Sequence, residues 1–286
     1  MWHPLLGDII MSNNRDFSFL IKSNQHFAFN IWDFDSARAV IDAAASIKQD
    51  VILQTSTGIF KVLPQKVFSS FVKEYATFKG INAWLNIDHC KEPETLKQAV
   101  DSGWDMIMCD GSSMPIDQNI SFTNEIAEYA HKHDVLIEAE VGQVKGIEDD
   151  VVVQQDAIAS KEEIVRFLKE TKIDFIAVAF GNAHGEYKVE PNLHYDLVEY
   201  TCGLSNIPFV VHGGSGLSDE VLTRLINIKG VVKLNISTDL KSACRRGMTQ
   251  AINTWSQPIK AHDLIHDEVM AVAVSKMKLI KLILTI

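Results

Sequence analysis

The stretch FVVHGGSGLSDEVLTRLI, residues 209–226, places an apolar run, a glycine-rich turn and a helix start in immediate succession. The run FVV favours a buried strand, and Ser218 followed by Asp219 and Glu220 is typical of a helix N-terminus. A strand that leads directly into a helix is the repeating unit of a parallel β/α sheet. Residues 209–226 therefore predict one such unit, with His212 just past the apolar run.

The same unit recurs along the chain. Eight β-rich runs are expected, at 26–31, 51–56, 81–88, 105–111, 135–141, 175–180, 209–215 and 231–238. Segments with helical periodicity are expected at 36–48, 65–79, 93–102, 121–133, 161–171, 192–203 and 218–228. Ser121 and Ser160 mark two further helix starts. Eight alternating strands and helices predict a closed (β/α)₈ TIM barrel, an α/β fold.

An open, doubly wound sheet is the alternative arrangement of such units. No glycine-rich dinucleotide-binding motif follows the first expected strand, which disfavours that alternative. No linker, repeat or low-complexity segment divides the chain, so a single domain over residues 1–286 is expected.

The overall composition restricts the partners of this protein. The formal net charge of −10 argues against nucleic acid and against an anionic membrane as partners, because both attract a dense cationic surface. The four cysteines show no C-x-x-C spacing and the N-terminus shows no secretory signal, so a reduced cytoplasmic protein is expected. Lysines interrupt the apolar segment 269–286, which favours a terminal amphipathic helix over a membrane span.

Three histidines indicate a metal site. Active sites of TIM barrels lie at the C-terminal ends of the strands, and His89, His184 and His212 each follow an apolar β-like run that ends at this rim. Neutral imidazole is a common zinc ligand, and three protein ligands with one open position are typical of catalytic zinc. The sequence therefore predicts a Zn²⁺ site suited to chemistry.

Two acidic residues are candidates for proton transfer. Asp88 directly precedes His89, and beside a divalent metal its carboxylate could act as a general base towards a substrate hydroxyl. The alternative is a structural role, in which Asp88 braces a histidine ligand. Glu148 lies in the polar segment 142–160, the longest irregular piece and a candidate lid. From the residues alone, Glu148 is best interpreted as part of a solvated acidic turn.

A second group of residues indicates an anion site. Backbone N–H groups of a glycine-rich turn before a helix can hold a phosphate, and TIM barrels often bind phosphate after strands seven and eight. The expected phosphate corner consists of Gly213, Gly214, Ser215, Asn235, Ser237 and Thr238, and Gly185 and Lys188 could close it.

At these residues the chain resembles the class II, zinc-dependent ketose-bisphosphate aldolases, and within them the tagatose-bisphosphate aldolase branch. The matching segments are AFN (28–30), IDH (87–89), CDGS (109–112), EAEVGQVKGIEDD (138–150), AVAFGNAHGEY (177–187), VVHGGSGLSDE (210–220) and KLNISTDL (233–240). The resemblance implies reversible cleavage of a ketose 1,6-bisphosphate of the tagatose or fructose type, or of a ketose 1-phosphate. The products would be dihydroxyacetone phosphate and an aldehyde.

The resemblance also implies roles for individual residues. His89, His184 and His212 would be the zinc ligands, and Asp88 would be the acid/base at the C4 hydroxyl. Glu148 would perform a second proton transfer, a role that the residues alone do not favour. The C1 phosphate would be held by Gly185, Lys188, Gly213, Ser215, Ser237 and Thr238.

Further expectations follow from the same resemblance. Asn235 would contact the enediolate, and Asp110 and Glu140 would stand behind the metal ligands. A monovalent cation, Na⁺ or K⁺, would lie near the phosphate, and the chain would assemble as a homodimer or homotetramer.

The chain departs from the family pattern near its C-terminus. Family members that act on bisphosphates present a late arginine to the distal phosphate, whereas the last arginine here is Arg246 and residues 258–270 offer only Lys260. The substrate is therefore expected to lack a distal phosphate or to bind it differently. The chain also ends in the apolar KLILTI, residues 281–286, where a polar tail is expected.

Three other functions stay open. A Schiff-base aldolase needs a lysine that points into the barrel, and Lys233 is the only plausible candidate. A sugar-phosphate-binding paralogue would keep the metal without aldolase turnover. A metal-dependent hydrolase is a further alternative, but the phosphate corner suits a phosphate that is held better than one that is cleaved.

Overall fold

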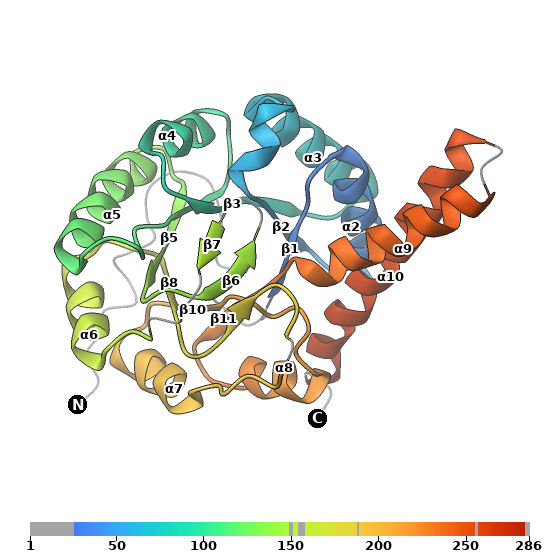
Figure 1. The fold of residues 1–286 in the computed structure, drawn as a ribbon. Helices are drawn as coiled ribbons and strands as arrows, with labels where there is room; N and C mark the ends of the chain where they lie inside the picture. Colours follow the sequence, from blue (N-terminus) through green and yellow to red (C-terminus); the bar gives the residue numbers. More distant parts are fainter. Residues whose placement is uncertain (1–25, 149–150, 154–157, 188, 255–256, 284–286) are drawn as a thin grey trace.

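The computed structural model describes residues 26–148, 151–153, 158–187, 189–254 and 257–283. Eight parallel strands close into a barrel in the order β1-β11-β10-β8-β5-β4-β3-β2 (Figure 1). The strands are β1 (His26–Asn30), β2 (Val51–Thr55), β3 (Ala83–Cys90), β4 (Met106–Cys109), β5 (Leu136–Val141), β8 (Phe175–Val178), β10 (Phe209–Val211) and β11 (Val231–Ile236). Each strand coincides with one of the eight expected runs, so the predicted TIM barrel is confirmed.

Helices surround the barrel (Figure 1). They are α2 (Phe34–Ser46), α3 (Gln65–Lys79), α4 (Pro93–Asp101), α5 (Ile116–His131), α6 (Lys161–Glu170), α7 (Tyr195–Leu204), α8 (Asp219–Ile226), α9 (Thr238–Thr254) and α10 (Pro258–Ile283), with a 3₁₀ helix, η1 (Thr57–Lys61). The starts expected at Ser160 and Ser218 are confirmed, because each side chain accepts a hydrogen bond from a backbone N–H of the first turn. The start expected at Ser121 is wrong. Pro115, whose ring fixes φ at −53°, directly precedes α5, so Ser121 lies inside the helix.

The strands separate two apolar layers. Because neighbouring residues of a strand point to opposite faces, Ile52 packs with Met106 and Phe175 in a small cluster inside the barrel. Val51 and Leu53 belong to the large cluster that lies between the barrel and its helices. Polar side chains occupy other interior positions of the strands, and these positions form the site described below.

The segment 142–160, expected to be irregular, contains regular structure. Strand β6 (Lys145–Glu148) pairs antiparallel with β7 (Val151–Val153) and parallel with β9 (Ala183–His184). The β-branched run of β7 supports this hairpin, and β9 supplies the other neighbour of β6. The candidate lid is therefore joined by strand pairing to the segment that carries His184.

The C-terminal part of the chain forms a helical hairpin that extends beyond the barrel (Figure 1). The helix expected from residue 269 is the second half of α10, and its buried face consists of Val269, Ala273, Met277 and Ile280. This spacing of three to four residues confirms the expected amphipathic helix. Within the described residues, no helix has the length and apolar character needed to cross a membrane.

Candidate active site

Closure of the barrel brings three histidines together. His89 comes from β3, His184 from β9 and His212 from the residue after β10, and one ring nitrogen of each lies within 4.8 Å of the others. Their exposed fractions are 7%, 6% and 1%. The ring of His89 lies 4.8 Å from that of His184 and 4.7 Å from that of His212, centre to centre. Three buried imidazoles this close together form a donor set that suits a divalent cation.

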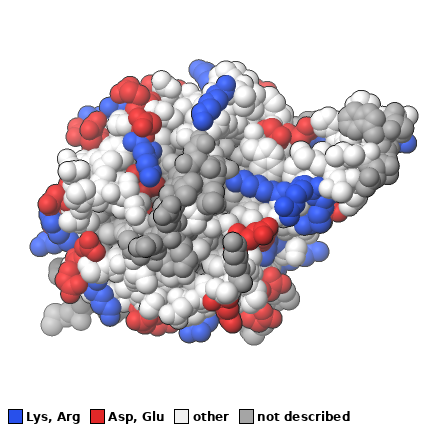
Figure 2. Space-filling model, in the orientation of Figure 1, with Lys and Arg blue, Asp and Glu red and all other residues white. Residues whose placement is uncertain are grey.

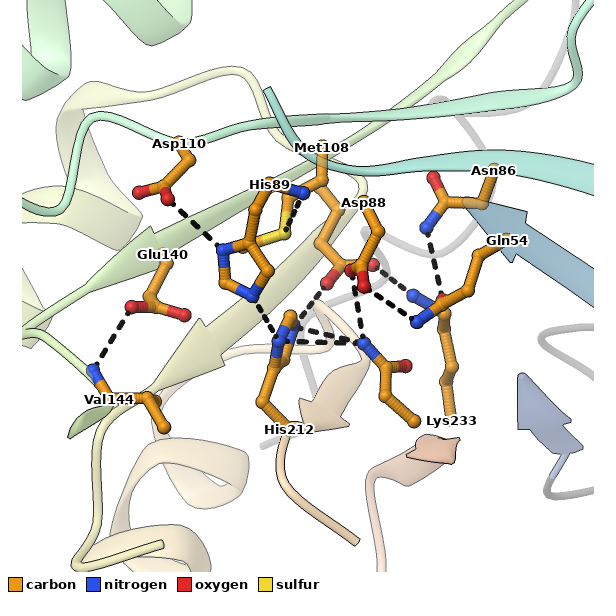
Figure 3. A network of polar contacts seen from close by, with 12 residues as sticks. Gln54, Asn86, Asp88, His89, Met108, Asp110, Glu140, Val144, His212 and Lys233 are labelled. Atoms are coloured by element: carbon orange, nitrogen blue, oxygen red, sulfur yellow. Dashed lines mark hydrogen bonds and ion pairs between the residues drawn. The ribbon is translucent and has the colours of Figure 1, made fainter. Parts of the chain in front are cut away.

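An irregularity in β3 turns His89 towards this cluster. The pairing register between β3 and β4 shifts between Ile87 and Cys90, and His89 has a φ of 47°, in the left-handed region. The backbone N–H of His89 donates to Met108 Sδ at 3.4 Å instead of joining the ladder. Adjacent residues of a regular strand point to opposite faces, and this bulge is what allows Asp88 and His89 both to face the site (Figure 3).

Carboxylates hold two of the imidazoles from behind. Asp110 Oδ2 lies 3.0 Å from His89 Nδ1, and Glu138 Oε1 lies 2.8 Å from His212 Nε2. The opposite nitrogens, His89 Nε2 and His212 Nδ1, then face each other at 2.9 Å (Figure 3). Burial raises the pKa of Asp110, but the hydrogen bond and the charge of His89, together with the hydrogen bond from Ser112, outweigh burial and hold the pKa below its usual range. Such carboxylate–histidine contacts are what orient metal ligands in proteins.

Glu138 also forms an ion pair inside the barrel, a contact that the sequence did not reveal. Its Oε2 lies 2.7 Å from Lys233 Nζ, and both side chains are 0% exposed. Burial raises the pKa of Glu138, but the charge of Lys233 and the hydrogen bond from His212 lower it to about 2. Lys233 is thus held as the ammonium partner of a carboxylate, an arrangement that argues against a Schiff-base nucleophile because the amine has no lone pair available. The alternation EAE in β5 could have indicated that Glu138 and Glu140 share one face.

Glu140 makes a different set of contacts. Its Oε1 accepts a hydrogen bond from the Val144 N–H at 3.4 Å, and among the described residues its Oε2 has no hydrogen-bond partner. Burial raises its pKa to about 8, although His89 lowers it in part. The structure therefore places Glu140 beside His89 and assigns the direct contact with His212 to Glu138.

Amide side chains surround the carboxylate of Asp88, which is 1% exposed. Asp88 Oδ2 accepts from Asn30 Nδ2 at 2.8 Å and from Gln54 Nε2 at 3.0 Å, and Asp88 Oδ1 accepts from Asn235 Nδ2 at 3.3 Å. Asn86 extends the network by donating to Gln54 Oε1 at 3.4 Å (Figure 3). Among the described residues, the hydrogen-bond partners of Asp88 are amides and not histidines, so this geometry favours the interpretation as a base over that of a brace.

The turn after β10 packs against the end of β11. Gly213 has a φ of 67°, which favours glycine, and the Gly214 N–H donates to Asn235 O at 3.1 Å. Ser215 Oγ accepts from the backbone N–H of Ser237 at 2.9 Å and of Asp239 at 3.3 Å. The expected phosphate corner is therefore one continuous piece of structure at the N-terminal end of α9.

The remaining predicted residues lie around this corner. Gly185 follows His184 with a φ of 92°, and Thr238 is the first residue of α9. Ser237 is buried, and among the described residues its Oγ has no partner. Glu148 is the last residue of β6. Lys188 lies outside the described residues.

Known proteins resemble this chain over most of its length. The family described as fructose-bisphosphate aldolase class-II matches residues 24–283. The 6-phospho-5-dehydro-2-deoxy-D-gluconate aldolase of Bacillus velezensis is 38% identical over 226 residues, which cover 75% of this chain and 76% of that protein. The enzyme of the same name from Bacillus subtilis (strain 168) is 37% identical over 219 residues, with 74% and 73% covered.

Solved structures give the same picture. The YdjI aldolase of Escherichia coli K12 superimposes with a TM-score of 0.78 at 26% identity, covering 90% of this chain and 91% of that one. Fructose-bisphosphate aldolase of Campylobacter jejuni superimposes with a TM-score of 0.74 over 90% of each chain, and at 21% identity this second likeness shows the fold alone.

The buried ion pair yields a prediction about stability. Glu138→Leu should lower the free energy of unfolding of the metal-free protein by about 3–5 kcal/mol, because it leaves the charge of Lys233 buried without a partner. The double variant E138L/K233M should recover much of this loss, since apolar residues of similar volume often replace a buried ion pair at little cost. Urea unfolding followed by circular dichroism measures both. Equal destabilisation of the single and double variants would contradict the assignment.

Proposed function

This chain belongs to the class II fructose-bisphosphate aldolase family and is a carbon–carbon lyase. On that premise, we propose that it uses Zn²⁺ to cleave a phosphorylated ketose reversibly to dihydroxyacetone phosphate and an aldehyde. The observation that carries the proposal is the position of Asp88. Its carboxylate is oriented by three amides and lies next to the three buried imidazoles, whose ring nitrogens lie within 4.8 Å of one another. A base beside a Lewis acid is the pair of groups that aldol cleavage requires.

The donor set favours zinc among the divalent ions. His89, His184 and His212 offer only imidazole nitrogen, and borderline-soft ions such as Zn²⁺ take such ligands more readily than Mg²⁺ or Ca²⁺. When bound there, Zn²⁺ would polarise the ketone of the substrate as a Lewis acid. Asp110 and Glu138 hold one nitrogen of His89 and of His212, so the opposite nitrogen of each ring would bind the ion.

Two acids of the chain would move protons. Asp88 would accept the proton of the hydroxyl on C4, so that the C3–C4 bond breaks and leaves its electron pair on the ketone fragment. Asn30 and Gln54 hold Oδ2 of Asp88 and thereby direct the carboxylate. Glu148 would return a proton to C3 and complete dihydroxyacetone phosphate. Support for Glu148 comes from strand pairing, because β6 ends at Glu148 and lies against β9, which contains His184.

The phosphate of the substrate would bind at the corner between β10 and α9. Backbone N–H groups of the turn and of the helix start favour an anion. The residues proposed for this role are Gly185, Lys188, Gly213, Gly214, Ser215, Ser237 and Thr238. Asn235 lies between Asp88 and His212 and would contact the enediolate formed by cleavage. A Na⁺ or K⁺ ion would lie near this phosphate. The chain would assemble as a homodimer or homotetramer.

The substrate proposed here carries one phosphate. The chain has no arginine after Arg246 for a distal phosphate, and its curated relatives are named for 6-phospho-5-dehydro-2-deoxy-D-gluconate. In that compound the ketone is next to the phosphorylated carbon and a carboxylate occupies the other end. A ketose phosphate with an unphosphorylated distal end therefore fits both observations better than tagatose or fructose 1,6-bisphosphate.

Metal removal tests the reaction type. EDTA treatment should abolish cleavage and added Zn²⁺ should restore it, because the proposed reaction relies on the metal to polarise the ketone. Asp88→Asn should lower kcat by about 10²–10⁴-fold, the usual contribution of a general base, while elemental analysis finds the same zinc content as in the wild type. Full cleavage by rigorously metal-free protein would refute the proposal.

Aldehyde preference tests the substrate class. Aldol addition from dihydroxyacetone phosphate should proceed with a higher kcat/KM for aldehydes that carry a terminal carboxylate or hydroxymethyl group than for aldehydes that carry a terminal phosphate. Steady-state rates across such a panel at equal Zn²⁺ loading measure this preference. A strict requirement for the terminal phosphate would overturn the monophosphate assignment and leave the aldolase assignment intact.

A further inference from the structure

The segments that carry His184 and His212 come from different parts of the barrel, yet a single hydroxyl group connects them. The backbone N–H of Ala183, the residue before His184, donates to Tyr187 Oη at 2.9 Å. Tyr187 Oη donates to the carbonyl oxygen of Gly213, the residue after His212, also at 2.9 Å. The hydroxyl of Tyr187 thus accepts a hydrogen bond from the segment of His184 and donates one to the segment of His212.

The two segments also lie in direct backbone contact. Gly213 has a φ of 67°, and a Cβ added there would lie 2.2 Å from Ala183 O. On the other side, Asn182 Nδ2 donates to His212 O at 2.9 Å, while Asn182 Oδ1 accepts from the Phe180 N–H at 2.9 Å. The backbone carbonyl groups of His212 and Gly213 therefore accept hydrogen bonds from Asn182 and Tyr187, the residues that flank His184.

These contacts set the distance between two of the three histidines. We propose that Tyr187 is a positioning residue whose hydroxyl fixes the separation of His184 and His212 and thereby the affinity for the metal; the inference rests on the metal role given to these histidines under the proposed function. Metal–nitrogen distances tolerate errors of only about 0.2 Å. Loss of the hydroxyl leaves the Ala183 N–H and the Gly213 carbonyl without this partner, which permits the two segments to separate.

The ring of Tyr187 has a separate role from its hydroxyl. It packs against the core, and a Cβ added at Gly216 would lie 3.3 Å from Tyr187 Cδ2, so the ring also supports the turn of the phosphate corner. If Tyr187 served packing alone, its ring would be sufficient and its hydroxyl would not be needed. Tyr187→Phe keeps the ring and removes the hydroxyl, and it therefore isolates the positioning role.

The test compares Tyr187→Phe with Tyr129→Phe, which removes a tyrosine hydroxyl that donates to Asp101 on the outer surface. The Zn²⁺ dissociation constant is measured by competition with a chromogenic chelator. Loss of a contact behind a metal ligand typically weakens binding about 10–100-fold, so Y187F should bind Zn²⁺ at least about 10-fold more weakly than the wild type, and Y129F should match the wild type. The visible absorption bands of the Co²⁺-loaded protein should shift in Y187F alone.

The outcomes separate this inference from the proposed function. Wild-type affinity and an unchanged Co²⁺ spectrum in Y187F would overturn the inference and leave the aldolase proposal standing. Equal weakening in Y187F and Y129F would overturn it as well, because the effect would not be specific to this contact. A wild-type protein that binds no Zn²⁺ would instead refute the metal role itself. Asn182→Ser, which removes the tie to His212 O, serves as a second variant and should also weaken Zn²⁺ binding, whether or not Y187F folds.

Discussion

The carboxylate of Glu138 connects the middle of the barrel to the histidine cluster. One of its oxygens pairs with Lys233 and the other with His212, and the three side chains come from β5, β11 and the end of β10. Two charges buried at 0% exposure are tolerated only when they neutralise each other and their remaining hydrogen-bonding capacity is used. The imidazole of His212 meets this condition, because it forms a hydrogen bond with the second carboxylate oxygen of Glu138. The orientation of the His212 ring therefore depends on the electrostatics of the barrel interior.

The hydrogen bonds of Asp88, the proposed base, depend on closure of the barrel in the same way. Its amide partners come from β1, β2 and β11, and β1 is the strand that pairs with both β2 and β11. Of these strands only β2 neighbours β3, which carries Asp88. Asn30 and Asn235 come from the first and last strands, so the set of amide partners is complete only once those two strands have met. The bulge at His89 then places the proposed metal ligand and the proposed base side by side. Fold and chemistry are coupled here through a few side chains, whereas the surrounding helices serve mainly to bury the outer face of the sheet.

Periodicity was sufficient to predict the barrel and the three histidines, because both depend on local patterns that repeat along the chain. The partners of the histidines could not be predicted in this way. Glu138 lies 74 residues from His212 and 95 residues from Lys233 in the sequence, and no local pattern records such pairings. In the sequence, Gln54 and Asn86 do not differ from other polar residues of strands. Only the closed barrel brings Gln54 to Asp88 and Asn86 to Gln54. The hairpin of β6 and β7 was missed because a two-stranded ribbon is marginal alone and here depends on pairing with β9.

A protein with a net charge of −10 must still attract a phosphate, and the corner at α9 shows how local charge can differ from the total. Asp239, in the first turn of α9, accepts a hydrogen bond from the Gly216 N–H and would repel an anion at this turn. Lys276 of α10 lies 3.3 Å from Asp239 and only 13% of its side chain is exposed, so it offsets that charge at close range. Basic side chains also gather over α9 beside the barrel (Figure 2). Because charges further away are screened by solvent, the surplus of acidic residues elsewhere on the surface has little influence on the potential at this corner.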